Sequence, residues 1–241
     1  MSTDEAEVPI DGRRLRWERH KRERRELIIG AAIQLIEEHP PGTEIHVHQI
    51  AERAGLARPA VYRHFTDRAD LDQAVQQQVL ELLLAELDPS VVLVGSIEQV
   101  IQRIVVTYVG WADAHPSLHR VGVREGVGRP GSPLRNAVQF VADIVGPIIT
   151  MGAETFGATL DEDDVASIDL LVFGLVSEVV GAVRLWLGRE ERVPSAPALA
   201  RRLADAVWFQ LDGLARNRGA VIDPTLSIEE IVARALGVEG P

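Results

Sequence analysis

The chain has 241 residues, 46% of them hydrophobic and 25% charged, which is close to ordinary globular usage. It contains no cysteine, which excludes disulfides, thiolate zinc sites, iron–sulfur clusters and a cysteine nucleophile. The first ten residues are acidic where a secretory signal needs a basic start, and the longest apolar stretch, residues 170–187, contains Glu178 and Arg184. We therefore expect a soluble, cytoplasmic protein without a membrane span.

The net charge of −11 is unevenly distributed along the chain. Residues 1–68 contain 12 Lys and Arg against 12 Asp and Glu, so residues 69–241 carry the whole negative excess. Eight basic residues crowd into one segment of thirteen: Arg13, Arg14, Arg16, Arg19, Lys21, Arg22, Arg24 and Arg25. A solvated tail is one interpretation of this segment. The other is a basic module for nucleic acid on an acidic body.

The first third of the chain predicts a disordered, basic arm followed by three helices. Residues 1–12 lack an apolar pattern, and the arm extends to residue 17. Apolar residues at three- and four-residue spacing predict a helix from about residue 18 to 39, and residues 46–53 and 58–64 form two shorter helices. Gly55 lies in the turn between these two, where a sharp corner requires positive φ.

The rest of the chain also predicts helices. Capping pairs open three of them: Asp67 with Asp70, Ser96 with Gln99, and Ser227 with Glu230. The expected helices end near residue 87, span about 97–114, 133–156, 162–188 and 197–217, follow Pro116, and close the chain at Gly237. No segment shows convincing strand alternation, so the fold class is all-α. We expect domains at residues 18–66 and 67–241, after the arm at 1–17.

Three helices with a glycine turn between the second and third are the plan of a DNA-binding helix-turn-helix. In that motif the third helix lies in the major groove, which is wide enough for one helix. The third helix here offers Arg58, Tyr62, Arg63 and His64, all able to donate hydrogen bonds to phosphates or base edges. The preceding arginine-rich arm supplies further cations, so we expect double-stranded DNA as a partner.

Residues 47–65, VHQIAERAGLARPAVYRHF, resemble the signature of the TetR family of transcriptional regulators. The resemblance covers residues 27–71 closely, and chain length and helix count agree beyond them. It implies an N-terminal helix-turn-helix domain, a linking fourth helix and a larger helical domain that binds a ligand and dimerises. It also implies a homodimeric repressor that binds a palindromic operator and is released by a small, largely apolar effector.

The resemblance assigns DNA contacts residue by residue. Tyr62 and His64 match family positions that contact the DNA backbone, and Arg63 lies between them. Arg58 stands at the start of the recognition helix, where base readout is expected. Arg68 matches a basic family residue that lies near phosphate.

Two positions depart from the family pattern. The family usually has hydroxyl side chains where this chain has His46 and Ala57, and the loss of such a cap costs about 0.5–2 kcal/mol. His46 still has a ring nitrogen that can donate to a phosphate. His48 and Pro59 complete the candidate DNA-binding residues.

The C-terminal part predicts its ligand site less sharply, because aromatic residues are typical both of pockets and of cores. The candidates are Trp111, His115, Phe140, Phe173, Glu178 and Arg184. The two charged residues are included because a charge on a mostly apolar helix needs a partner or a polar ligand.

A dimer interface is expected on the last two long helices, as the resemblance implies. Gly174, Ser177 and Gly181 place small residues on one helical face, which permits close approach of another helix. We pair this face with Leu203 and the neighbouring apolar positions 207 and 211.

Enzyme interpretations find little support. His115 and His119 have the spacing of a metal pair, but Pro116 between them interrupts a regular helix. The acidic run 161–164 lacks the glycine and oxygen spacing of a calcium loop, and no nucleophile elbow, phosphate loop or dinucleotide motif is present. We expect no catalytic residue, metal or cofactor. A TetR-like activator, and a ligand-binding module without operator binding, stay open.

Overall fold

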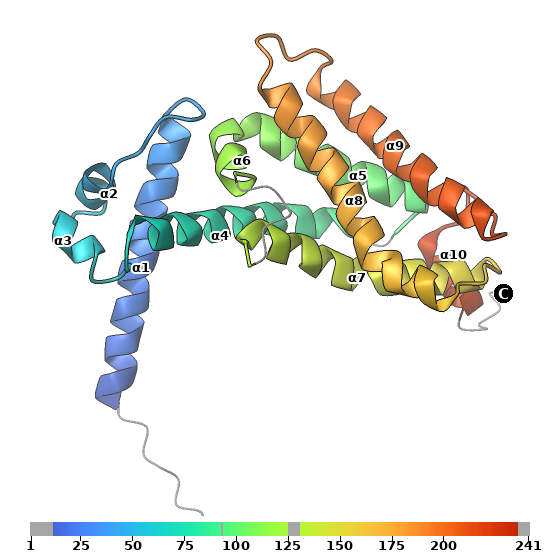
Figure 1. Cartoon of the computed structure of the whole chain (residues 1–241), viewed down its shortest axis with the longest axis horizontal. Helices are drawn as coiled ribbons and strands as arrows, with labels where there is room; N and C mark the ends of the chain where they lie inside the picture. Colours follow the sequence, from blue (N-terminus) through green and yellow to red (C-terminus); the bar gives the residue numbers. More distant parts are fainter. Residues whose placement is uncertain (1–11, 93, 125–130, 236–241) are drawn as a thin grey trace, which may run out of the picture. The chain divides into compact units, whose positions relative to one another are not determined.

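The computed structural model describes residues 12–92, 94–124 and 131–235, and within these ranges the chain is built from helices without a β-strand (Figure 1). The all-α prediction is therefore confirmed. The helices are α1 (Gly12–Glu38), α2 (Val47–Arg53), α3 (Arg58–Val61), α4 (Arg68–Leu87), the 3₁₀ turn η1 (Asp88–Ser90), α5 (Ile97–Ala114), α6 (Pro116–Gly122), α7 (Pro133–Thr155), α8 (Glu162–Leu187), α9 (Ala196–Asn217) and α10 (Ile228–Ala235). The expected disorder of the first residues and the end at Gly237 lie outside the described residues.

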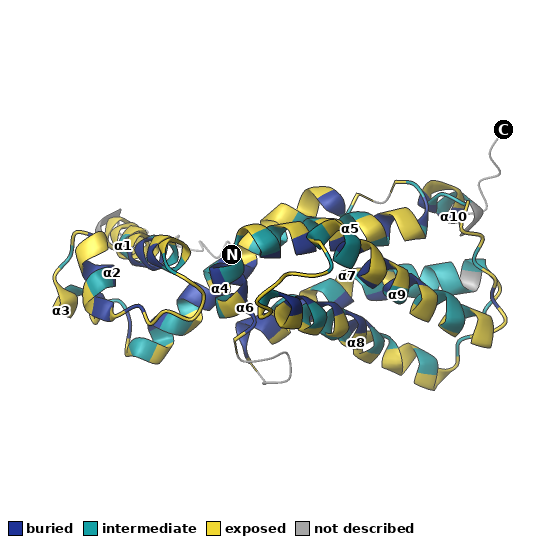
Figure 2. Cartoon of the chain, turned by 90° about the horizontal axis from the view of Figure 1, so that it is seen from above, coloured by how far each residue is buried: buried dark blue, intermediate teal, exposed yellow. Residues whose placement is uncertain are grey.

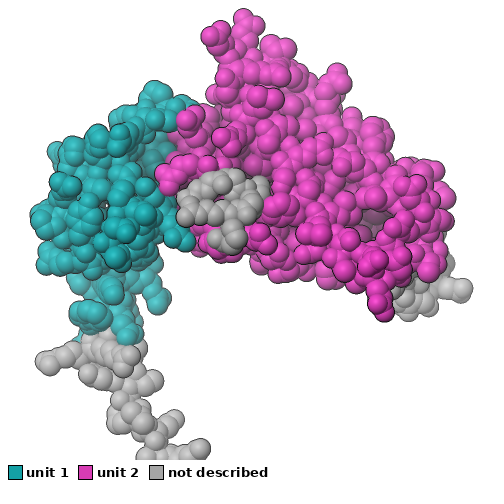
Figure 3. Space-filling view, viewed as in Figure 1, with its two compact units in different colours: residues 1–75 teal, residues 76–241 magenta. Residues whose placement is uncertain are grey.

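The chain divides into two compact units (Figure 3). The first ends at Val75 and the second begins at Gln76, so α4 contributes its first part to one unit and the rest to the other. Each unit has its own buried core.

The first unit is organised by the buried face of α1, which packs against α2. Ile28 and Leu35 of α1 are buried, as are Val61 and Phe65 around the third helix. Each such side chain removed from water contributes about 1.5–3 kcal/mol. Gly55 has φ of 65°, which confirms the predicted positive-φ corner between α2 and α3.

Two helix boundaries in this unit differ from the sequence prediction. α1 begins at Gly12, not near residue 18, because residues 13–26 are strong helix formers without an internal glycine or proline. This corrects the expected flexible arm over residues 12–17. α3 ends at Val61, not at His64, and continues as a tight turn in which the His64 N–H donates to Val61 O (2.9 Å).

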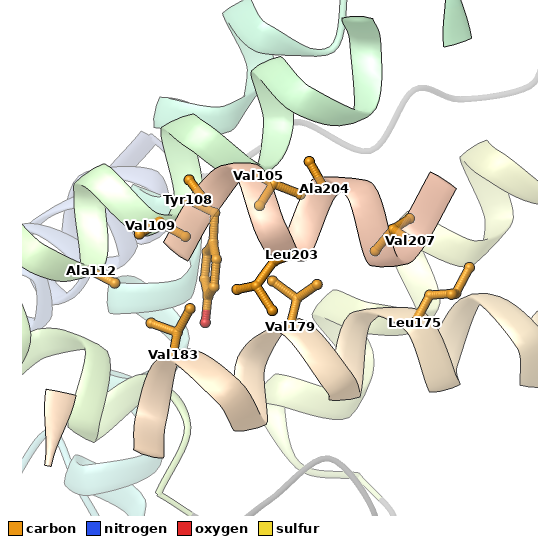
Figure 4. Packing of buried hydrophobic residues seen from close by; sticks show 11 residues of the cluster. Val105, Tyr108, Val109, Ala112, Leu175, Val179, Val183, Leu203, Ala204 and Val207 are labelled. Carbon is orange, nitrogen blue, oxygen red and sulfur yellow. The ribbon is translucent and has the colours of Figure 1, made fainter. Parts of the chain in front are cut away.

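The second unit is centred on α5, α8 and α9, whose buried side chains meet in one cluster (Figure 4). Its members include Val109 of α5, Val179 of α8 and Leu203 of α9. The capping boxes predicted before α5 and α10 are confirmed: Gln99 N–H donates to Ser96 Oγ (3.3 Å), and Glu230 N–H donates to Ser227 Oγ (3.2 Å).

Large apolar side chains remain on the surface of this unit, and exposed positions line its long helices (Figure 2). By length and composition alone, residues 133–153 of α7 and the whole of α8 are apolar enough to cross a membrane. α8 also has a buried face that includes Val179 and Val183, as the core helix of a soluble domain does.

Candidate nucleic-acid interface

The start of α2 is capped without a hydroxyl. His46 is its N-cap residue, and its backbone N–H donates to Gln49 Oε1 (2.7 Å). This is the returning half of a capping box, supplied by Gln49 at the third helical position. The start of α3 has no side-chain cap, because Ala57 stands there and Pro59 follows in the first turn.

Two histidines lie side by side at the start of α2. The rings of His46 and His48 stack with centroids 5.6 Å apart and an interplanar angle of 15°. His46 Nδ1 lies 3.5 Å from Glu44 Oε1, and both histidine side chains are exposed. They present polar ring edges to solvent beside the recognition helix.

The recognition helix divides its residues between core and solvent. Val61 and Phe65 are buried, whereas Arg58, Tyr62 and Arg63 are exposed. The Arg58 guanidinium carbon lies 6.0 Å from the centre of the Tyr62 ring. Because Val61 and Phe65 point into the core, the exposed side chains point away from it, so three hydrogen-bond donors project together from one short element.

Arg25 of α1 holds the end of this element in place. Its Nη1 donates to the carbonyl oxygen of His64 (2.8 Å), and its Nη2 donates to Asp70 Oδ1 (3.4 Å). The guanidinium also lies 4.1 Å from the centre of the Phe65 ring. Hydrogen bonding from the Thr66 N–H, and then from Arg25, lowers the pKa of Asp70. We name these contacts the Arg25 clamp.

Sequence reasoning placed Arg25 among the phosphate-binding cations and missed its internal role. The available signal was its position one turn before Ile28 and Ile29, both of which are buried. A basic side chain at that spacing lies over the edge of the core, where its stem packs and its head finds carbonyls.

The two remaining basic candidates are partly engaged within the chain. His64 is half-buried, and its Nδ1 is buried without a hydrogen-bond partner among the described residues. Burial, and then the positive charges of Lys21 and Arg63, lower the pKa of His64. Arg68 Nε donates to Asp72 Oδ1 (2.8 Å), and Arg68 Nη1 donates to Ile45 O (2.7 Å). Arg68 thus ties the segment before α2 to the start of α4.

The six ligand candidates of the second unit lie in different environments. The structure brings together Trp111 and His115, whose ring centroids are 5.4 Å apart. Phe173 packs against the cluster of Leu80, Val123, Leu134 and Val138. Phe140 is 55% exposed and Arg184 is exposed. Glu178 accepts a hydrogen bond from Gln210 Nε2 (2.7 Å) on the surface.

A buried polar pair in this unit was missed. Tyr108 Oη and His119 Nε2 share a hydrogen bond of 2.8 Å, and His119 is 2% exposed. Burial, with a smaller effect of the Arg184 charge, lowers the pKa of His119 to about 4, and burial raises the pKa of Tyr108. The available signal was the position of His119 directly after Leu118, which is buried. From the sequence, His119 was considered only as one half of a metal-binding pair. No group of three His, Cys, Asp or Glu able to hold a metal occurs in the described ranges.

The expected dimer surface needs one correction. A Cβ added at Gly174 or Gly181 would meet no atom within 4 Å, so this face of α8 is open within the chain. Leu203 and Val207 instead lie in the internal core, because that side of α9 packs against α5 and α8. The exposed apolar side chain of α9 nearest in sequence is Phe209, which is 67% exposed.

Comparison with known proteins identifies the DNA-binding segment of the chain. Residues 28–75 match the family model described as bacterial regulatory proteins, tetR family. Residues 28–75 are therefore a TetR-family DNA-binding domain. The chain is a DNA-binding transcriptional regulator. The match covers α2, α3, the second part of α1 and the first part of α4, and leaves residues before 28 outside.

The matches to individual proteins extend over most of the length of this chain. An uncharacterised HTH-type transcriptional regulator of Mycobacterium tuberculosis is 23% identical over 218 residues, or 89% of this chain and 88% of that protein. A tetR-family regulator from Streptomyces coelicolor has a similar fold, with a TM-score of 0.60, 23% identity and coverage of 91% of this chain and 90% of that one. FadR from Bacillus subtilis, solved in complex with stearoyl-CoA, has a TM-score of 0.56 and 16% identity, and the match covers 76% of this chain and 96% of that one.

Proposed function

We propose that this regulator is a homodimeric repressor that binds a palindromic operator and is released by a largely apolar effector. The observation that carries the proposal is the recognition helix. It projects Arg58, Tyr62 and Arg63 into solvent from a buried frame, inside the segment that matches the family.

The exposed residues take different parts in operator binding. Arg58, at the start of α3, reads a base edge in the major groove, since an arginine can form two hydrogen bonds with guanine. The Tyr62 hydroxyl and the Arg63 guanidinium bind phosphates, which position the helix. His46 and His48 at the start of α2 donate to the backbone on the other side of the groove.

The remaining candidates act mainly through placement. Ala57 and Pro59 are small residues at the tip of the recognition helix, so they permit close approach to the DNA. His64 and Arg68 lie next to the phosphate path, and their contacts within the chain set the orientation of the recognition helix and of α4. The Arg25 clamp supports the same geometry.

Dimerisation is required because one short helix contacts few base pairs. To distinguish the operator from the many non-specific sites of a genome, two helix-turn-helix domains, or heads, must be held at a fixed spacing of about one helical turn or slightly more. The open face of α8, with Gly174, Gly181 and exposed Leu185, and exposed Phe209 of α9, is the surface we assign to this contact. Glycines permit close approach there, and the apolar side chains lose water on association.

The effector binds the second unit, where apolar side chains dominate. The stearoyl-CoA bound to FadR, a protein of similar fold, supports an effector with a long apolar part. Trp111, His115 and Phe173 are the partly buried candidates for its contacts, with Phe140, Glu178 and Arg184 nearer the surface. To release DNA, the effector must bind the released state more tightly by a few kcal/mol. We place the protein in the cytoplasm, where its DNA lies.

The experiment is selection of duplexes from a randomised pool by the full chain, followed by titration of the selected duplex. We expect a palindromic consensus, one dimer per duplex, and release of DNA by stearoyl-CoA but not by CoA. Absence of any enriched sequence favours a ligand-binding module. Enrichment combined with activation of a reporter promoter favours an activator.

A further inference from the structure

The first turns of α1 continue the buried face of the same helix as a stripe of a different chemistry. Ile28 and Leu35 are buried against the rest of the first unit. Toward the N-terminus, intervals of four and three residues along this face give Arg24, Lys21 and Trp17. We name Trp17, Lys21 and Arg24 the basic stripe. α1 runs on past α2 and α3 toward its N-terminus (Figure 1), and by helical spacing the stripe continues the face that carries Ile28 and Leu35.

The basic stripe carries no acidic residue, unlike the opposite side of the helix. There Arg19 and Arg22 stand four residues before Glu23 and Glu26, the spacing at which ion pairs form on a helix. By spacing alone, the opposite side of α1 mixes acidic and basic residues, whereas the stripe itself contains only basic ones and Trp17. A row of positive charges on one side of a helix is typical of a surface that binds a polyanion.

The stripe and the recognition helix belong to one electrostatic surface. The positive charges that lower the pKa of His64, at the end of the recognition turn, include Lys21 and Arg24 of α1 together with Arg63. The Arg25 clamp, on the adjacent position of α1, binds the carbonyl oxygen of the same His64 at 2.8 Å. α1 is therefore held against the recognition turn, and Lys21 and Arg24 lie close enough to the end of that turn to act on His64.

Trp17 adds an observation that charge alone does not explain. Its side chain is 64% exposed, whereas Trp186 and Trp208 are buried. Lys21 Nζ lies 5.6 Å from the centre of the Trp17 ring. A tryptophan has a flat apolar face and a single N–H donor, so on a surface it is typical of contacts that are covered in a complex.

We propose that the basic stripe is a second DNA-binding element, which binds the phosphate backbone flanking each half-site. Lys21 and Arg24 bind phosphates, and Trp17 lies against a deoxyribose with its indole N–H directed at a phosphate oxygen. The element is sequence-independent, and it is rigid because it is the same helix that frames the recognition turn. It rests on the proposed operator binding, and it lies outside residues 28–75 that match the family.

The test compares two double variants of the full chain that change net charge equally. K21Q/R24Q removes the charges of the stripe, and R19Q/R22Q removes two charges from the opposite side. Glutamine is a good helix former, so both variants keep α1. Binding to a labelled duplex of mixed sequence, and to the duplex selected by the wild type, is measured across salt concentrations.

We expect K21Q/R24Q to reduce the slope of log K against log salt by about 0.9 for each phosphate that is no longer neutralised, or about 1.8 per head. R19Q/R22Q should reduce it by less than half as much, and duplex should protect tryptophan fluorescence from acrylamide in the wild type more than in Trp17→Phe, since the chain has four tryptophans. Equal reductions of the slope in the two variants, or an unchanged slope in K21Q/R24Q, would overturn the proposal that the basic stripe binds DNA. Failure of the wild type to bind either duplex overturns the proposed function instead.

Discussion

The two units leave different kinds of surface uncovered. In the first, the exposed side chains beside the recognition helix are donors and cations, such as Arg58 and Arg63. In the second, large apolar side chains are exposed along the long helices, among them Phe140, Leu170 and Phe209. The first kind of surface fits phosphate and base edges, and the second fits an apolar partner. We infer that operator contact and dimer contact are divided between the units.

The units also treat buried polar groups differently. The first uses a charged network, in which Arg25 joins the carbonyl oxygen of His64 to the carboxylate of Asp70. The second uses an uncharged pair, Tyr108 with His119. A cation is tolerated near solvent and DNA, whereas an apolar core favours neutral groups that satisfy one another. The comparison predicts that acid pH destabilises the second unit through its buried histidine.

The largest effect should follow from this buried histidine. The pKa of His119 is lowered from 6.5 to about 4, so its neutral form stabilises the fold above pH 6.5 and this contribution is lost as pH falls toward 4. The full loss is about 3 kcal/mol and is reached below pH 4, and about 2 kcal/mol of it falls between pH 6.5 and 4.5. The free energy of unfolding in urea, measured at pH 6.5 and 4.5 for the full chain and for Y108F/H119L, gives this loss as the difference between the two proteins. The variant keeps an apolar core but has no histidine there. An equal fall in both proteins would assign the effect to surface carboxylates.

The assigned dimer face gives the second prediction. Gly181→Leu places a side chain where the chain itself has open space, so the monomer keeps its fold. If two α8 helices meet there, overpacking costs about 1–3 kcal/mol and shifts the protein toward monomer. Sedimentation at several concentrations measures the shift. Gly110→Leu, at an equally open glycine of α5, is the matched control. A variant that stays dimeric places the interface elsewhere.

The third prediction separates readout from positioning within the head. Arg58→Ala should cost about 1–3 kcal/mol on the selected duplex and relax the preference at one base per half-site. Arg63→Ala should instead weaken binding to selected and mixed duplexes alike, because a phosphate contact carries no sequence information. Competition binding with single-base variants of the duplex tests both. Uniform weakening by Arg58→Ala would make it a phosphate contact.

Local features were predictable from the sequence because their causes lie within one turn of chain. The Ser96–Gln99 capping box and the positive φ of Gly55 follow from residue type and spacing. The helical start of α1 was missed because a charged segment without apolar periodicity was taken as an arm, although its helix propensity is high.

Contacts across long separations were not predictable in the same way. Arg25 and His64 are 39 positions apart, and no periodicity on α1 identifies that partner. Leu203 is a second example. The spacing of residues on α9 predicts an apolar face, but it does not predict which helix packs against that face. The spacing of apolar residues indicates that a helix face is buried, but only the tertiary fold shows which element covers it.

Hydroxyl-radical labelling tests the division between the units most directly. The chain has two tyrosines, of which Tyr62 is 40% exposed and Tyr108 is buried, and Phe140 is an exposed aromatic of the second unit. With the selected duplex bound, we expect labelling of Tyr62 to fall severalfold while that of Phe140 stays unchanged. Unchanged labelling of Tyr62 together with protection of Phe140 would place the DNA on the second unit and contradict the account.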